Sequence, residues 1–313
     1  MFIDRLIDNI RIKNNPTVAG LDPKLEYVPA FIRNKYLEQY GINAKGAAEA
    51  ILEFNKRIID ALYDIIPAVK PQLAYYEMYG CEGIRVFDET VKYAKSKGLI
   101  VIADAKRGDI GATAEAYSAA YLGATKLNDE IEQSYFDADA LTVNPYLGID
   151  GIKPFLNDCM KYNKGIFILV KTSNKSSGQL QDLATEDGKR IYEIMAEYVD
   201  EWGKELIGKY GYSSVGAVVG ATYPQQAKII REKLKNAYIL VPGYGAQGGT
   251  AADAANSFNS DGLGAIVNAS RSIMCAYKSE RWKDKYSEIE FAEASRAEAM
   301  RMRDELNEAI KNK

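Results

Sequence analysis

Short apolar runs of strand length recur along this chain, and they constrain its fold more than any other feature of the sequence. Eight such runs alternate with longer amphipathic stretches, and most of them lack polar residues at every second position. An apolar run of this length is typical of a parallel strand that is buried on both faces. The runs are Thr17–Leu21, Ala68–Lys70, Leu99–Asp104, Ala140–Asn144, Ile166–Lys171, Val215–Gly220, Tyr238–Val241 and Ala265–Asn268.

Helical patterns fill the stretches between these runs. The stretch Ala47–Ile65, for example, has apolar residues at the spacing of one helix face. Eight strands that alternate with helices over roughly 250 residues predict a (β/α)8 TIM barrel in the α/β class. An open, doubly wound sheet is the alternative, because periodicity does not reveal whether a sheet closes. No linker-like segment interrupts the pattern, so we expect a single domain over residues 1–313 that ends in a helix at about 284–311.

The composition limits the chemistry and the partners. The chain has no histidine, which removes the commonest general base, the commonest metal ligand and every Ser-His or Cys-His mechanism. Its three cysteines form no CxxC pair, so we expect reduced thiols, a cytoplasmic protein and no zinc site. A net charge of −3 argues against a nucleic-acid polymer as partner. The apolar runs are too short to span a bilayer, and the first residues do not form a signal peptide.

The segment LIVIADAKRGDIGAT, at the third strand, carries the densest charge pattern. Residues two apart share one face of a strand, so Asp104 and Lys106 should follow Ile102 toward the top of the barrel interior. Asp109 follows where the chain leaves the strand. Two carboxylates favour the charged form of a lysine between them, and such a lysine is a good proton donor to a carbanion. A structural ion pair at the barrel rim is the alternative interpretation.

Two segments near the end of the chain predict an anion site. VPGYGAQGGT follows the seventh strand and VNASRSI follows the eighth, which is the usual phosphate-binding position in barrels. Glycines permit close backbone approach, and Arg271 offers a planar, permanently charged fork. The first segment also fits G-x-G-x-x-G, but it lies late in the chain and follows Pro242, which argues against a Rossmann dinucleotide site.

The charge pattern resembles the signature D-x-K-x-x-D-I-x-x-T of the orotidine 5'-monophosphate decarboxylase family, with Asp104, Lys106, Asp109 and Thr113 at the matching positions. The resemblance runs from about residue 17 to 277 and fits the longer branch of the family, with a helical insertion at about 24–46. Further positions follow the family pattern and would bind substrate or complete its alternating Asp/Lys network: Asp22, Lys70, Ser173 in a flexible loop, Gln247, Ser270 and Arg271. The family commonly has glycine at the position of Ser270.

The resemblance implies a reaction and an assembly. Orotidine 5'-monophosphate would lose CO2 to give uridine 5'-monophosphate, without a metal ion or cofactor, and Lys106 would protonate C6. Asp104 would crowd the departing carboxylate, while Asp109 and Thr113 would reach the site of a partner subunit in a homodimer. Two alternatives are a metal-dependent sugar-phosphate decarboxylase or aldolase on the same scaffold and a catalytically silent nucleotide-binding protein. The metal-dependent relatives carry an acidic residue where this chain has Lys70, so we favour the decarboxylase.

Overall fold

Eight parallel strands close into a barrel. The computed structural model describes residues 1–245 and 247–313. Each strand pairs in parallel with two neighbours, and β1 closes the barrel by pairing with β10. This closure confirms the (β/α)8 prediction over the open sheet. Around the barrel the strands are β1 (Thr17–Leu21), β10 (Ala265–Ala269), β9 (Ala237–Val241), β8 (Ser213–Val219), β7 (Gly165–Lys171), β6 (Ala140–Val143), β3 (Ile100–Arg107) and β2 (Ala68–Pro71).

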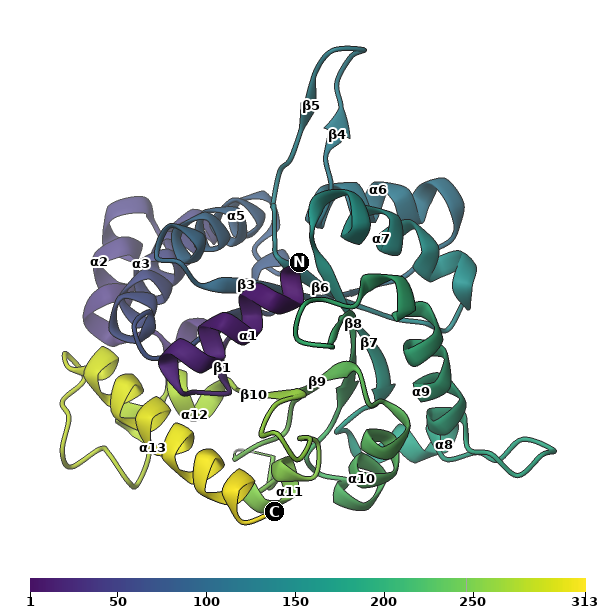
Figure 1. The fold of residues 1–313 in the computed structure, drawn as a ribbon. Helices are drawn as coiled ribbons and strands as arrows, with labels where there is room; N and C mark the ends of the chain where they lie inside the picture. Colours follow the sequence, from purple (N-terminus) through teal and green to yellow (C-terminus); the bar gives the residue numbers. More distant parts are fainter. Residues whose placement is uncertain (246) are drawn as a thin grey trace.

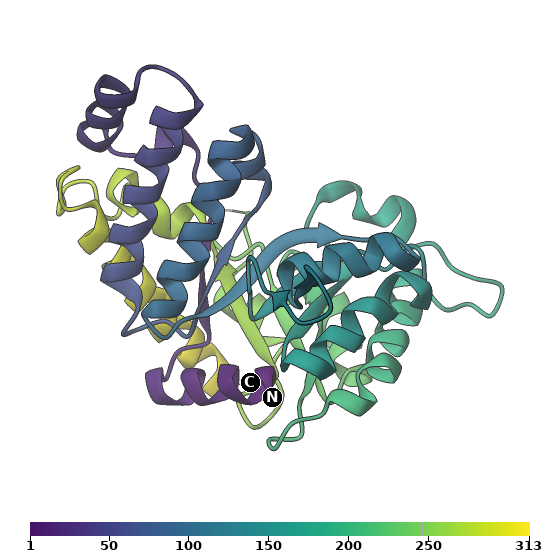
Figure 2. The ribbon, with the colours of Figure 1, turned by 90° about the horizontal axis from the view of Figure 1, so that it is seen from above.

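Helices surround the barrel (Figure 1 and Figure 2). The longer ones are α2 (Ala30–Tyr40), α3 (Ala44–Leu62), α5 (Gly80–Ser96), α6 (Gly111–Tyr121), α7 (Ile149–Tyr162), α9 (Ile191–Trp202), α10 (Pro224–Lys233) and α13 (Phe291–Lys311). The short helices α4 (Ala74–Glu77), α8 (Gly178–Gln181), α11 (Ala251–Ala255) and α12 (Arg271–Met274) lie in segments that follow strand ends. Helix α3 begins three residues before the predicted stretch, because the Asn43 side chain accepts a hydrogen bond from the Gly46 N–H at 3.1 Å and caps it.

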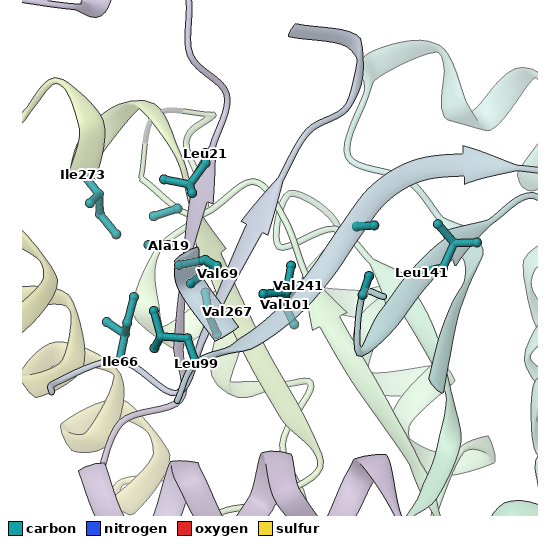
Figure 3. Packing of buried hydrophobic residues seen from close by; sticks show 14 of the residues in the cluster. Ala19, Leu21, Ile66, Val69, Leu99, Val101, Leu141, Val241, Val267 and Ile273 are labelled. Atoms are coloured by element: carbon teal, nitrogen blue, oxygen red, sulfur yellow. The ribbon is translucent and has the colours of Figure 1, made fainter. Parts of the chain in front are cut away.

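Alternate residues of each strand face opposite layers of the core. Figure 3 shows part of the outer layer, between strands and helices, with Val69, Val101 and Val267 among its members. Their neighbours Ala68 and Ile102 face the barrel interior. The alternation therefore assigns one set of side chains to each layer, as expected for a barrel whose strands are buried on both faces.

Helix α1 (Phe2–Lys13) closes the amino-terminal end of the barrel (Figure 1). Its apolar face joins the interior cluster, and the Phe2 ring meets Phe167 of β7 edge to face at 6.2 Å between centroids. The Ile3 N–H donates to Ser214 Oγ at the start of β8. Helix α1 thus covers the amino-terminal end of the interior, and a cavity lies at the carboxyl ends of the strands.

Two features differ from the sequence pattern. A hairpin of β4 (Thr125–Lys126) and β5 (Glu132–Gln133), which the periodicity did not predict, projects from the barrel beside α6 and α7 (Figure 1). The final helix α13 begins at Phe291, after a turn in which Ser287 donates two hydrogen bonds to the Glu290 carboxylate. None of the described helices combines the length and the apolar character needed to cross a membrane.

Candidate active site

A cavity of about 650 Å³ opens at the carboxyl ends of the strands. The inward-facing positions change from apolar to polar at this level, because Ala68 is followed two residues later by Lys70, and Ile102 by Asp104. Functional groups of (β/α)8 barrels lie at this end. Eight of the ten predicted site residues line the cavity: Asp22, Lys70, Asp104, Lys106, Ser173, Gln247, Ser270 and Arg271.

The Asp104 carboxylate is the centre of the charged network. Its Oδ2 accepts hydrogen bonds from Lys70 Nζ at 2.7 Å and Gln72 Nε2 at 2.9 Å. Its Oδ1 accepts from Lys106 Nζ at 2.6 Å and Thr142 Oγ1 at 2.9 Å. Four donors on three strand ends therefore fix both oxygens of one carboxylate, which aligns the two ammonium groups on either side of it.

Burial and charge act against each other in this network. Burial alone would raise the pKa of Asp104, but Lys70 and Lys106 outweigh it and hold that pKa well below its usual range. Burial likewise opposes the charged form of Lys70, yet Asp104 and Asp22 raise the pKa of this buried ammonium. Both groups are thus charged at neutral pH, which is the condition under which a buried ion pair is stable.

The surroundings of Asp22 raise the pKa of its carboxyl group, whereas those of Asp104 lower it. Burial raises the pKa of its carboxyl, and the Asp104 carboxylate adds to that rise, while Lys70 and Ser270 lower it less. Its Oδ1 is buried and has no hydrogen-bond partner within the described parts of the chain. A buried acceptor of this kind costs free energy unless a ligand satisfies it, so Asp22 is suited to accept a hydroxyl hydrogen.

The backbone at Lys106 departs from a regular strand. Its φ is 50°, and the register of β3 against β6 shifts between Ala103 and Arg107. The Lys106 N–H donates to Thr142 Oγ1 at 3.0 Å, which holds this conformation. A non-glycine residue in the left-handed region costs about 1–3 kcal/mol and persists where its surroundings fix it. Strand alternation alone therefore does not position the Lys106 side chain, which is 45% exposed at the rim of the cavity.

The opposite side of the cavity is formed by the segments after β9 and β10. Three glycines after β9 have positive φ, which allows the backbone to turn tightly beside Gln247. A Cβ on Gly243 would lie 3.3 Å from Ser173 Cβ and 3.4 Å from Gln247 Oε1, so these two predicted residues approach each other across this glycine. Ser270 and Arg271 begin helix α12 at the same side of the cavity.

The loop after β7 carries Ser173 and is held by its neighbours. Thr222 Oγ1 donates to the Ser173 carbonyl at 3.1 Å, and the Tyr223 hydroxyl donates to the Asn174 carbonyl at 3.0 Å. At the base of this loop the fully buried Lys171 ammonium pairs with Asp182 at 2.8 Å. These contacts orient the Ser173 side chain over the cavity, although the segment as a whole is polar and partly exposed.

Two predicted site residues lie away from this cavity. Asp109 follows β3, where its Oδ1 accepts from the Ile110 N–H at 2.8 Å, and Thr113 is exposed on α6. Neither lines the cavity of its own chain.

Sequence reasoning missed several residues of the cavity wall. Gln72 and Thr142 donate hydrogen bonds directly to the Asp104 carboxylate. Because side chains alternate between the two faces of a strand and Ala140 faces the interior, Thr142 could have been identified as inward-facing. Asn268 is 7% exposed and its Oδ1 lacks a described partner. The cavity is also lined by two residues of the 24–46 insertion, Lys24 and Tyr27, which no local sequence pattern indicated.

Comparison with known proteins agrees with this geometry. A sequence model of the orotidine 5'-phosphate decarboxylase / HUMPS family matches residues 39–284. The chain belongs to this family. Within it, the chain is 44% identical over 309 residues to the orotidine 5'-phosphate decarboxylase of Caldicellulosiruptor saccharolyticus, covering 99% of each chain. It is 41% identical over 310 residues to that of Clostridium perfringens strain SM101, again covering 99% of each.

Solved structures of the family share the fold. The Leishmania donovani OMP decarboxylase superposes with a TM-score of 0.73 at 28% identity, covering 99% of both chains. The Leishmania donovani UMP synthase superposes with a TM-score of 0.74 at 30% identity, covering 99% of this chain and 56% of that one. The barrel fold is therefore that of solved members of the orotidine 5'-phosphate decarboxylase / HUMPS family.

Proposed function

We propose that this protein decarboxylates orotidine 5'-monophosphate to uridine 5'-monophosphate and CO2 in pyrimidine biosynthesis, without a metal ion or cofactor. The observation that carries the proposal is the Asp104 carboxylate fixed between Lys70 and Lys106 at the end of the barrel. The family and the names of its 44% and 41% identical relatives support this substrate. The Lys70 ammonium also disfavours a divalent cation beside Asp104, since it already neutralises that carboxylate.

The cavity suits a nucleotide with its phosphate and its base at different walls. Arg271 and the backbone N–H of Ser270 bind the 5'-phosphate, Gln247 bridges the phosphate and the base, and Ser173 hydrogen-bonds the pyrimidine. The sugar lies between them, where Asp22 Oδ1, which has no hydrogen-bond partner among the described residues, accepts a hydroxyl hydrogen. This orientation directs C6 and its carboxylate toward Asp104 and Lys106. Phosphate binding, remote from C6, contributes energy to loop closure and desolvation.

The chemical step follows from the charges around Asp104. The bond from C6 to the carboxylate breaks, its electron pair stays on C6, and CO2 leaves. The Asp104 carboxylate, whose low pKa keeps it ionised, repels the substrate carboxylate. Lys106 stabilises the developing carbanion and transfers a proton from Nζ to C6. The neutral amine then regains its proton from water.

We further propose that the active form is a homodimer with shared sites. Asp109 and Thr113 lie outside the cavity of their own chain, as residues would that complete the site of a partner. Residues 1–313 act as one catalytic domain, since α1 and α13 both pack onto the same barrel. The three free cysteines suit the reducing conditions of the cytoplasm, which is the compartment we propose.

The decisive experiment is the ultraviolet absorbance of orotidine 5'-monophosphate mixed with purified protein and excess EDTA. We expect a fast fall to the spectrum of uridine 5'-monophosphate, which would establish activity and metal independence together. No change, with EDTA or with added magnesium, would reject the decarboxylase. Turnover that requires magnesium would indicate the metal-dependent relatives instead.

A further inference from the structure

A second cavity, of about 690 Å³, lies behind the loop that follows β9. Helices α11 and α13 form its walls, and they lie side by side at the carboxyl-terminal end of the chain (Figure 1). Tyr244 lines both this cavity and the active-site cavity. It therefore connects the proposed phosphate site with the last helix of the chain.

The loop after β9 depends on glycine conformations. Gly243, Gly245 and Gly248 have φ values of 93°, 71° and 96°. Short backbone bonds, such as Gly245 N–H to Gly249 O at 2.9 Å, close the turn. Glycine loses more conformational entropy on ordering than any other residue, so a glycine loop needs contacts that fix it.

Tyr244 supplies a side-chain anchor for this loop. It is the single aromatic residue of the segment 242–250, and it is 5% exposed. Its hydroxyl donates to Glu305 Oε2 on α13 at 2.5 Å. A hydrogen bond to an ionised acceptor is stronger than one between neutral groups.

The acceptor of this bond is itself held in place. Arg301 Nη1 lies 2.5 Å from Glu305 Oε1, and Arg301 Nη2 lies 3.5 Å from the Tyr244 hydroxyl. Arg301 also donates to both oxygens of Glu298, at 2.7 and 2.8 Å, and Glu298 accepts from Trp282. Tyr244 is thus hydrogen-bonded to a network of three charged residues, which lie about one turn apart on α13: Glu298, Arg301 and Glu305.

We propose that Tyr244 is a positioning residue of the phosphate site, through which Glu305 and Arg301 of helix α13 hold the β9 loop in its binding conformation. The inference rests on the proposed function, because it assigns the 5'-phosphate to this loop. Without the Tyr244–Glu305 bond the glycine loop samples other conformations, and the site loses affinity for the phosphate while the Asp104 network is unchanged.

The test compares substrates with and without phosphate. We expect Tyr244→Phe to lower the ratio of kcat/KM for orotidine 5'-monophosphate to kcat/KM for orotidine by about tenfold, mostly through KM. Glu305→Ala should match it, and Glu305→Gln, which keeps an acceptor, should recover part of the loss. Tyr210→Phe is the matched control, because it removes a tyrosine–carboxylate bond to Asp8, outside both cavities, and should leave the ratio unchanged.

The outcomes separate this inference from the proposed function. An unchanged ratio in Tyr244→Phe, or an equal loss with both substrates, would overturn the positioning role. Wild-type turnover tests the function alone. Titration with uridine 5'-monophosphate and with uridine tests the same phosphate preference without turnover. A protein that binds the nucleotide through Tyr244 but does not decarboxylate would leave the inference intact and reject the function.

Discussion

Ser270 packs directly over Gly20. A Cβ on Gly20 would lie 2.0 Å from Ser270 Oγ and 2.8 Å from Ser270 Cβ, both closer than real Cβ contacts. Gly20 is buried in β1, two residues before Asp22. Ser270 directly precedes the predicted phosphate ligand Arg271. Gly20 thus leaves the space that the Ser270 side chain occupies, just after the end of the neighbouring strand β10.

We expect Gly20→Ala to destabilise the protein by about 1–3 kcal/mol, because overpacking forces Ser270 to move. The double variant Gly20→Ala/Ser270→Gly should recover most of that loss, since the space taken by the new methyl group is released. Urea unfolding of the two variants and of Ser270→Gly measures both effects. If Gly20→Ala and Gly20→Ala/Ser270→Gly were equally stable, the contact with Ser270 would not be what limits the residue at position 20.

We expect Lys106→Ala to remove turnover while the affinity for uridine 5'-monophosphate stays within a few-fold of wild type. A positioned general acid contributes about 10²–10⁴-fold, and the loss of positive charge beside the carbanion adds to this. Single-turnover kinetics and isothermal titration measure the two quantities separately. Near-normal turnover would overturn the assignment of Lys106 as proton donor.

Arg271→Ala should act mainly on binding. Loss of a charged hydrogen bond to phosphate costs about 1.5–3 kcal/mol, so we expect KM to rise by about 10- to 100-fold. Steady-state kinetics with the nucleotide, and with the phosphate-free nucleoside as the internal control, measure this effect. An effect confined to kcat, or one equally large for the nucleoside, would contradict the phosphate role.

Asp104→Asn should lower the free energy of unfolding at neutral pH by about 3–5 kcal/mol, because the buried Lys70 ammonium loses its counter-charge. The folded-state pKa of Asp104 is lowered, so its stabilisation is complete above the unfolded value of about 3.9 and is lost as pH falls toward the folded value. Urea unfolding at pH 7 and at stepwise lower pH should show the wild-type advantage shrinking below about pH 4.

Asp129→Asn provides the control for this pH dependence. Asp129 pairs with Lys126 at the exposed hairpin and should change stability by less than about 0.5 kcal/mol at any pH. If Asp104→Asn were equally mild, or if its deficit stayed constant down to pH 3, the ion pair with Lys70 would not be the source of the stabilisation.

The barrel was predictable because its signal is local. All eight predicted apolar runs coincide with barrel strands, and their ends differ by a few residues at most. A strand buried on both faces must be apolar along its length, so the sequence carries that requirement directly. The β4–β5 hairpin has strands of two residues and an exposed surface, which leaves no periodic pattern to detect.

The charged network was only partly predictable. The motif indicated that Asp104 and Lys106 lie in the same site. The positive φ of Lys106 and the bulge in β3, however, arise from contacts with β6. The contribution of Lys24 and Tyr27, and the Tyr244–Glu305 bond across 61 residues, depend on packing between distant segments. Such contacts leave no trace in the local pattern, and the roles of the site residues remain predictions.

The shared active site can be tested by mixing two inactive variants. Asp109 and Thr113 lie outside the cavity that contains Lys106 of the same chain. If Asp109 serves the partner subunit, homodimers of Lys106→Ala and of Asp109→Ala are both inactive. A mixed dimer would carry one site with both substitutions and one with neither.

After random exchange in an equimolar mixture, roughly a quarter of all sites would be intact, as two-fold symmetry requires. We expect turnover to rise toward that level after unfolding and refolding together, whereas variants mixed without exchange should stay inactive. No recovery despite mixed dimers, verified by mass spectrometry, would assign Asp109 to its own subunit.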